Sequence, residues 1–261
     1  FQKAKTRCKG PQEGDRLLHL LLPWYNIPIA APQGAANTDE RSTAQDMKIE
    51  IGPKRPDWFT PAYPEMFDLF SHLEVSAAIP QALFAITTWK ENGKPNLCFH
   101  SWGSFHGDRT AFFAVMGNLF QHTHTYANLR REGCFCLNFL PVSCYDRLSA
   151  TIEQNGPEED EFAVGGFSLE EGKAVHAPRI GESFLTMECT PRELRDLTGQ
   201  GQTAMVIGQV VRVAVEESYA RGLDKRYGPE GFMMLLPAPQ NLLTGEPSSS
   251  GVATLRLERL D

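Results

Sequence analysis

The sequence contains no apolar run that approaches the roughly eighteen residues needed by a membrane-spanning helix. It also lacks an excess of basic residues, since 25 Lys and Arg stand against 32 Asp and Glu, for a net charge of -7. The basic residues are scattered along the chain, which argues against a surface that neutralises nucleic-acid phosphates. We therefore expect a soluble protein that acts without a membrane and without nucleic acid.

Cysteine is present, but no two cysteines form the CxxC pair that is typical of metal sites and redox motifs. A chain of 261 residues can bury a sizeable core without disulfide bonds. We expect reduced thiols in a cytoplasmic protein, with most of the thiol side chains packed in the interior. The six cysteines are Cys8, Cys98, Cys134, Cys136, Cys144 and Cys189.

Glycine-rich motifs for phosphate loops and dinucleotides are missing, and so are a catalytic triad and a pair of catalytic carboxylates. The acidic run EEDE, residues 158–161, is interpreted as a solvated face, because runs of like charge usually are. Side chains alone thus offer no complete acid–base or nucleophilic machinery.

The first 46 residues show no sustained helical or strand period. Their apolar stretch LLHLLLPW weakly resembles a signal peptide, but His19 and Pro23 interrupt it. We interpret residues 1–46 as a poorly ordered or peripheral arm, or as an added or misassigned extension, with Met47 as the original start. The functional domain is then expected to cover residues 47–261.

Alternation of apolar and polar residues predicts a mainly β protein with helical insertions. Short strands follow one another closely, with turns such as KENGKPN between them, which favours an antiparallel barrel over βαβ units. Strands are expected over residues 82–89, 97–104, 110–116, 134–140, 183–190 and 203–217 and near 252–257. Helical segments are expected after Pro64, over 125–132 and before Gly165 and Gly166.

The stretch FQHTHTYANLRREGCFCLNFL, residues 120–140, has the pattern of a helix followed by a strand. A threonine at the head of the helix, two arginines in its last turn and Gly133 just past its end are typical of helix termini. In CFCLNFL, the phenylalanines and the leucine share one face, and the cysteines and the asparagine share the other. We predict that the helix leads back into the sheet and that both cysteines are core residues.

Two kinds of ligand site are compatible with the start of this stretch. His122 and His124 have a spacing that some zinc sites use, but no third ligand is obvious, and two half-exposed loop histidines are the simpler interpretation. Thr123 and Thr125 stand where free backbone N–H groups and the helix dipole can receive a phosphate. Either threonine could instead merely cap the helix, and both possibilities stay open at this point.

Several motifs, in a fixed order, resemble the flavin reductase-like, FMN-binding split-barrel family (flavoredoxin-like). With the flanking strands they cover most of residues 80–215, and they are PNLCFHSWGSF, TAFFAVMGN, HTYANLRREGCFCLNFL and EDEFAVGGFSLEEGKAVHAPRIGESFLTMEC. The resemblance implies an antiparallel split β-barrel that forms a homodimer and binds FMN near the subunit interface.

The resemblance also implies which residues contact the cofactor. The residues expected at the flavin ring are Ser101, Trp102, Gly103, Ser104, Met116 and Gly117. Those expected at the phosphate are Asn118, His124 and Thr125. Backbone N–H groups beside the ring could bond its polar atoms and stabilise its reduced form. Family members often carry serine or threonine where this chain has Met116, Gly117 and Asn118.

Three functions follow as hypotheses. The first is an FMN-dependent oxidoreductase of the NAD(P)H:flavin reductase type, in which flavin N5 accepts a hydride and no catalytic side chain is required. The second is an FMN-binding electron carrier that serves a redox partner protein and has no nicotinamide site. The third and most distant is a zinc-dependent hydrolase that uses His122 and His124. Residues 225–232 could form a lid, a nicotinamide contact or an ordinary surface loop.

Overall fold

The computed structural model describes residues 48–61, 71–236, 241–246 and 251–258. The chain divides into a larger compact unit built on Ala82–Met233 and a smaller one that includes Ile27–Gln81 and Met234–Ala253. The expected N-terminal arm and most of the expected helix after Pro64 lie outside the described residues. Every residue expected at the cofactor lies in the larger unit.

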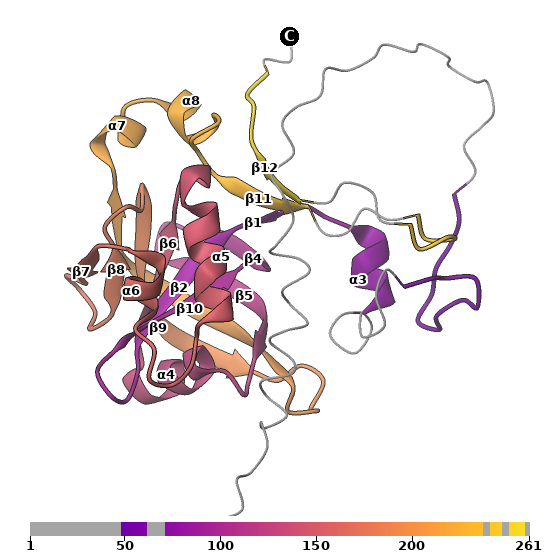
Figure 1. The fold of residues 1–261 in the computed structure, drawn as a ribbon, viewed down its shortest axis with the longest axis horizontal. Coiled ribbons are helices and arrows are strands. Elements are labelled where there is room, and N and C mark those ends of the chain that lie inside the picture. The colour runs from indigo at the N-terminus through magenta and orange to yellow at the C-terminus, as the bar shows by residue number, and fades with distance from the viewer. Residues whose placement is uncertain (1–47, 62–70, 237–240, 247–250, 259–261) are drawn as a thin grey trace, which may run out of the picture. The chain divides into compact units, whose positions relative to one another are not determined.

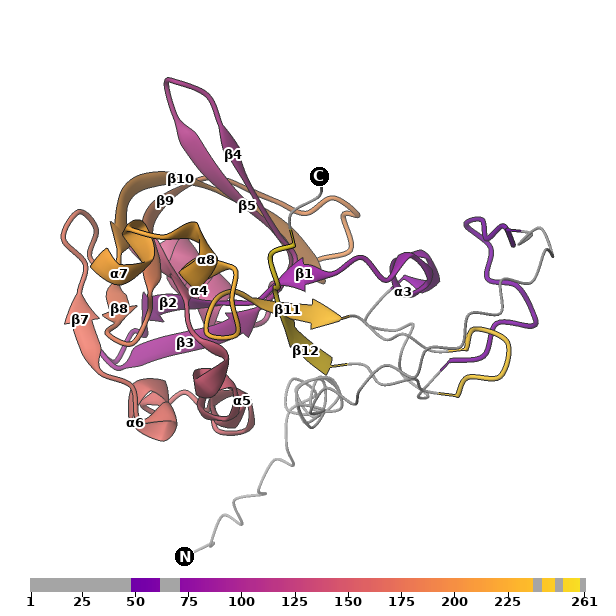
Figure 2. The same cartoon turned by 90° about the horizontal axis from the view of Figure 1, so that it is seen from above.

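The larger unit contains a curled antiparallel sheet of seven strands in the order β3-β2-β6-β9-β10-β5-β4 (Figures 1 and 2). This confirms the predicted mainly β, antiparallel split barrel with helical insertions. Its strands are β2 (Phe84–Trp89), β3 (Pro95–His100), β4 (Gly103–Gly107), β5 (Phe112–Phe120), β6 (Phe135–Phe139), β9 (Leu185–Arg195) and β10 (Thr203–Val215).

The remaining strands form two small sheets, one of β7 (Leu169–Glu171) and β8 (Pro178–Ile180), and one of β1 (Gln81–Ala82), β11 (Met233–Leu236) and β12 (Gly251–Thr254). The helical elements are α3 (His72–Ala77), α4 (His124–Glu132), the 3-10 turn η1 (Val142–Cys144), α5 (Tyr145–Glu153), α6 (Glu161–Gly165), α7 (Glu217–Ala220) and α8 (Leu223–Arg226). Within the described part of the chain, no helix is both long and apolar enough to cross a membrane.

The segment expected as one strand over 97–104 is two strands, β3 and β4. These strands form the two edges of the seven-stranded sheet, so the chain crosses from one edge to the other at Ser101 and Trp102. At the start of β4, a Cβ on Gly103 would lie 2.7 Å from the ring of Phe84. The strand can therefore pass over the core here only because residue 103 has no side chain.

The helix and strand predicted over 120–140 are confirmed as α4 and β6. Thr123 caps α4, because its hydroxyl accepts the N–H of Tyr126 at 3.3 Å, and Gly133 ends the helix with a φ of 64°. The phenylalanines and leucine of β6 belong to the main core, and Cys134 and Cys136 lie in a second buried cluster. All five cysteines in the described region carry free thiols.

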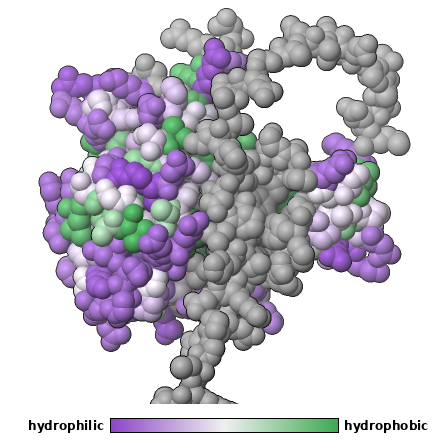
Figure 3. Space-filling model, in the orientation of Figure 1, coloured by the Kyte–Doolittle hydropathy of each residue, from purple (hydrophilic) through white to green (hydrophobic). Residues whose placement is uncertain are grey.

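After α5, residues 154–160 are not helical and Glu161–Gly165 form the short helix α6, which ends at Gly166, so the predicted helical excursion is confirmed in part. The expectation of a solvated acidic face, however, is wrong for Glu161, which is only 1% exposed and pairs with the buried Lys90. Glu158 does face solvent, and Asp160 caps α6 by accepting the N–H of Ala163. Elsewhere, the face drawn in Figure 3 shows hydrophilic side chains around smaller apolar patches on the larger unit.

Candidate functional site

The two edges of the curled sheet meet where β3 leads into β4. The imidazole of His100, at the end of β3, lies 2.9 Å from the carbonyl oxygen of Gly117 on β5. The N–H of Gly117 in turn donates to the carbonyl of Trp102 at 2.8 Å. Backbone pairing places Gly103 opposite Met116. The structure thus brings the residues expected at the flavin ring together. We call this place, formed by residues 100–104 and 116–118, the seam.

His100 is a residue of the seam that the sequence did not identify. Its side chain is 5% exposed and packs edge-on against Phe84, with the ring centroids 5.6 Å apart. Burial lowers the pKa of His100 to about 4, although the bond to Gly117 opposes the shift. At neutral pH the ring is therefore uncharged and donates its Nε2–H to the Gly117 carbonyl. The nearby Trp102 ring lies 5.7 Å from it.

The β5 side of the seam contains a bulge. Met116 pairs with Val206 of β10 and Leu119 pairs with Ala204, so Gly117 and Asn118 together face a single residue of β10. Asn118 adopts the left-handed region, with a φ of 49°. These two residues are therefore displaced from the regular ladder of β5 and β10, while the N–H and the carbonyl of Gly117 bond Trp102 and His100.

The residues expected at the flavin ring differ in which of their atoms could contact it. The side chain of Met116 is 0% exposed and belongs to the core, so only its backbone faces the seam. At Gly117, an added Cβ would make only ordinary contacts, with Trp102 at 3.6 Å, so the protein's own packing does not require glycine there. Ser101 is fully buried, and its hydroxyl has no hydrogen-bond partner within the described structure. Ser104 is exposed.

Two of the three residues expected at the phosphate, His124 and Thr125, have side chains that are engaged inside the protein, while Asn118 lies in the bulge of β5. The Thr125 hydroxyl, 3% exposed, accepts the Asn96 amide at 2.9 Å. The half-buried His124 ring donates to the backbone of Asn155, and burial together with the charge of Lys90 lowers the pKa of His124. An anion at the start of α4 can therefore bind the first backbone N–H groups of the helix. These groups have no hydrogen-bond acceptor within the helix itself.

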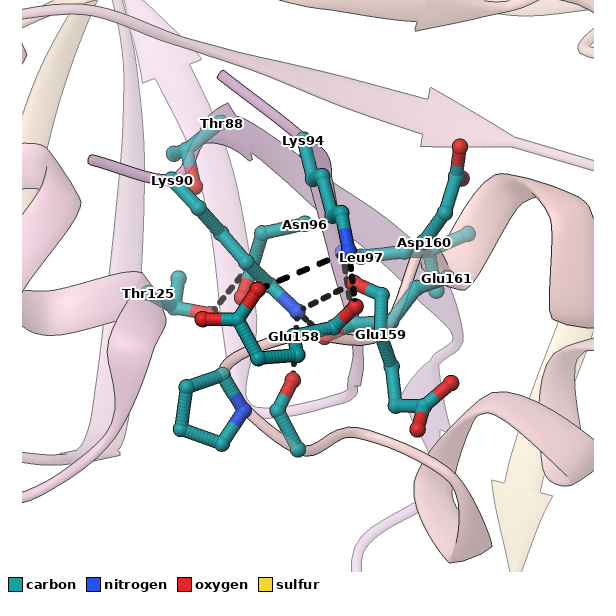
Figure 4. Close-up of polar contacts among 12 residues, drawn as sticks. Thr88, Lys90, Lys94, Asn96, Leu97, Thr125, Glu158, Glu159, Asp160 and Glu161 are labelled. Atoms are coloured by element: carbon teal, nitrogen blue, oxygen red, sulfur yellow. Dashed lines mark hydrogen bonds and ion pairs between the residues drawn. The ribbon is translucent and has the colours of Figure 1, made fainter. Parts of the chain in front are cut away.

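A buried cluster of charges lies behind the start of α4 (Figure 4). The ammonium of Lys90 lies 2.8 Å from Glu161 Oε1 and 2.9 Å from the carbonyls of both Gly156 and Glu159. The second carboxylate oxygen of Glu161 accepts the N–H of Leu97. Burial raises the pKa of Glu161 to about 7, against the opposing effect of Lys90. Periodicity cannot reveal this cluster, because Glu161 ends a run of acids that otherwise faces solvent.

The described residues offer little for the zinc hypothesis. His122 packs against the ring of Phe120, with centroids 5.5 Å apart, while His124 is directed to Asn155. No group of three or more His, Cys, Asp or Glu side chains in the described ranges is placed to hold a metal ion. The buried thiols are also unreactive, since burial raises the pKa of Cys98 and of Cys189 to about 12.

The seam and the start of α4 lie at opposite ends of β3. Asn96, which bonds Thr125, is the second residue of β3, and Ser101 follows its last residue. Five residues of extended strand span about 16 Å at about 3.3 Å each. The arrangement suits an elongated ligand that presents an anionic group to the helix start and a flat, largely apolar ring to the seam.

The segment 225–232, expected as a lid or a loop, packs on the core through its last residue. Phe232 lies against Phe139 and Phe184, with ring centroids 5.4 Å and 5.1 Å apart. Tyr219, just before the segment, stacks on Phe184 at 4.6 Å. The end of this segment is thus anchored in the aromatic core that also contains Phe84, beneath the seam.

Residues 76–230, more than half of the chain, match the flavin reductase like domain. The chain belongs to the flavin reductase-like family. Family membership places the protein among flavin-related oxidoreductases and electron carriers, whose members are typically oligomeric flavin-binding proteins. A protein of Aquifex aeolicus (strain VF5), described as uncharacterized, is 23% identical over 154 residues, which are 58% of this chain and 77% of that protein.

Several solved structures share the fold. Flavoredoxin of Desulfovibrio vulgaris (Miyazaki F) is 20% identical, with a TM-score of 0.57 over 70% of this chain and 91% of its own. Nitrilotriacetate monooxygenase component B from Bacillus cereus is 16% identical, with a TM-score of 0.63 over 82% and 99%. A flavin reductase with a split barrel domain from Shewanella frigidimarina NCIMB 400 is 21% identical, with a TM-score of 0.58 over 77% and 98%.

Proposed function

We propose that this protein binds FMN and acts as an NAD(P)H-dependent flavin oxidoreductase. The observation that carries the proposal is the arrangement along β3, with a helix start at one end and the bulged, glycine-containing seam at the other. Both ends match the needs of FMN, whose phosphate favours a helix N-terminus and whose ring favours an apolar slot with a few fixed donors. The residues of the seam fit the ring, since Gly117 leaves space beside Trp102 and the Ser101 hydroxyl lacks a protein partner.

The residues have distinct roles in this proposal. The first N–H groups of α4, at His124 and Thr125, bind the phosphate, while Asn96 holds the helix start against β3. The seam orients the ring through the space that Gly117 leaves beside Trp102 and through the Ser101 hydroxyl, which can donate a hydrogen bond to a polar atom of the ring. FMN, when bound, supplies the hydride chemistry at N5, so no acid or base among the side chains is needed.

We further propose that two copies of the chain associate and that FMN lies near their interface. The last part of β10 carries three exposed valines in alternation, Val211, Val213 and Val215, which are 45%, 50% and 40% exposed. A row of apolar side chains on a strand is typical of a surface that another protein covers. Light scattering of the purified protein measures the mass and tests this association directly.

The function is tested by the visible absorbance spectrum of the purified protein, repeated without oxygen after NADH and then NADPH are added. Flavin bands that bleach with either nucleotide support the proposal and identify the electron donor. Bands that persist with both nucleotides but vanish with dithionite would instead indicate an electron carrier that depends on a partner protein. If no bands appear after incubation with FMN, the proposed cofactor is wrong.

Gly117 tests the placement of the ring. We expect Gly117→Ala to leave the free energy of unfolding nearly unchanged, because the new Cβ meets only Trp102 at ordinary distance. FMN affinity should nevertheless fall by at least about tenfold, which is about 1.4 kcal/mol, because the methyl group occupies space that the ring needs. Fluorescence titration measures the affinity, and urea denaturation measures the stability.

The control is Gly52→Ala, since nothing lies within 4 Å of a Cβ at that position. It should change neither stability nor flavin affinity. Normal FMN binding by Gly117→Ala would mean that the ring does not approach β5 at this residue, and the seam would then have to be reassigned.

A further inference from the structure

The buried pair of Lys90 and Glu161 has no role in the proposed flavin chemistry, yet it lies directly behind the start of α4. We propose that Glu161 takes up a proton when the phosphate of FMN binds at this helix start, and that Lys90 then provides the positive counter-charge. This inference rests on the proposed function, because it needs an anion at α4. It assigns a role to Lys90, which the sequence patterns do not single out, and to Glu161, which they place on a solvated face.

A short chain of contacts joins the helix start to the carboxylate (Figure 4). The hydroxyl of Thr125, in the first turn of α4, accepts the amide of Asn96 at 2.9 Å. The next residue of β3, Leu97, donates its N–H to Glu161. An anion at the first turn of α4 is therefore separated from Glu161 by two adjacent residues of one strand, with both connecting groups buried.

Lys90 has the partners that it needs to stay charged without its carboxylate. Besides Glu161, its ammonium contacts the carbonyls of Gly156 and Glu159, both at 2.9 Å. If Glu161 becomes neutral, these two uncharged acceptors still hold the ammonium in place. The pair thus changes from a net charge of zero to a net charge of +1 without a rearrangement of Lys90.

The burial of the pair makes its charge responsive to a nearby anion. The side chains of Lys90 and Glu161 are 5% and 1% exposed, so solvent and salt screen them weakly. The pKa of Glu161 is already about 7, and an additional negative charge raises it further. The charge of Lys90 also acts on α4, because it contributes to the lowered pKa of His124.

The other charged or titratable groups around Glu161 lie on β3, on α4 and in the segments just before β3 and α6. Asp160, which caps α6, raises its pKa. Cys98 on β3 feels the charge of Glu161, but burial holds the thiol protonated with a pKa of about 12. Glu158 pairs with Lys94 at 3.6 Å at the exposed edge of the cluster. His124 on α4 is the one neighbour that could take up the proton in place of Glu161, and the experiment must separate these two groups.

The test is calorimetric titration of the flavin-free protein with FMN at about pH 8, in two buffers of different ionisation enthalpy. At this pH the phosphate is already a dianion, since its second pKa is about 6. If the pKa of Glu161 rises by one to two units, we expect an uptake of about 0.4 to 0.8 proton per FMN. Riboflavin, which lacks the phosphate, should bind without this uptake.

Two variants identify the group. Glu161→Gln should bind FMN without proton uptake, and His124→Asn should retain the uptake. If Glu161→Gln does not fold, the comparison of FMN with riboflavin and the His124→Asn result still decide the question. FMN binding without proton uptake by the unmodified protein would overturn the inference and leave the proposed function standing, as would loss of the uptake in His124→Asn. Absence of any FMN binding would instead overturn the proposed function, and the inference with it.

Discussion

Replacing Arg179 by methionine should lower the free energy of unfolding by about 3 to 5 kcal/mol, because it leaves a buried carboxylate without its cation. Arg179 of β8 and Glu188 of β9 form a direct ion pair, and their side chains are 5% and 0% exposed. The methionine fills a similar volume, so the loss comes from the unpaired charge rather than from a cavity. Urea denaturation of both proteins at neutral pH measures the difference.

The carboxylate of Glu188 also holds the loop between β7 and β8. It accepts the backbone N–H groups of Lys173 at 3.1 Å, Ala174 at 2.5 Å and Val175 at 2.9 Å. Because this loop carries His176, which stacks on Trp89 with centroids 6.0 Å apart, the substitution should loosen the contact between the loop and the end of β2. Proteolysis in the loop should accelerate together with the loss of stability.

Arg212 provides a matched control, because it approaches the same carboxylate oxygen at 4.0 Å but is 51% exposed. Arg212→Met should cost less than about 1 kcal/mol, as exposed ion pairs do. In the double variant Arg179→Met/Glu188→Gln, part of the loss should be recovered, since an amide oxygen still accepts N–H groups and carries no charge. Equal effects of Arg179→Met and Arg212→Met would contradict the argument that burial decides the value of the pair.

The sequence predicts the elements that carry clear local signals. The helix α4 has both of its end signals, Thr123 and Gly133, and β6 alternates strictly because two different clusters bury its two faces. The β10 strand is found for the same reason, since its alternation is long. These predictions depend on local chemistry, and the structure confirms the elements with ends that differ by one or two residues.

The structural features that the sequence does not predict depend on contacts between distant residues. The break between β3 and β4 results from the crossing of the sheet edges, and nothing in the local alternation marks it. Glu161 is buried beside Lys90, which lies 71 positions earlier in the chain and pairs with it. Thr125 is predicted as a phosphate ligand from its place at the helix head, yet its hydroxyl is directed to Asn96, a residue of another strand. The role of the backbone beside it remains a proposal.

Acidification should destabilise the protein through His100. The pKa of this histidine is about 4 in the folded protein and 6.5 when it is freely exposed. Between these values the unfolded chain binds a proton and the folded protein does not, so stability is complete above about pH 6.5 and falls toward about pH 4. The difference between a pKa of 6.5 and one of about 4 corresponds to a loss of about 3 kcal/mol.

His100→Gln removes the titrating group but keeps a donor that can reach the carbonyl of Gly117. At neutral pH this variant should lose about 1 kcal/mol, because the edge-on contact with Phe84 is gone. The difference in unfolding free energy between the unmodified protein and the variant should then shrink, and finally reverse, as the pH falls. Denaturant titrations across the range from about pH 7 to about pH 4 measure this difference.

The comparison between the unmodified protein and the variant is needed because Glu161 changes the stability with pH in the opposite direction. Glu161 has a folded pKa of about 7, above its ordinary 4.5, so its contribution to stability is complete below about pH 4.5 and is lost as the pH rises through 7. That contribution is the same in both proteins and cancels in the comparison. His106→Gln, at an exposed position on β4, should leave the pH profile unchanged. If the difference for His100→Gln does not vary with pH, His100 is not held uncharged, and its bond to Gly117 would then come from the imidazolium form.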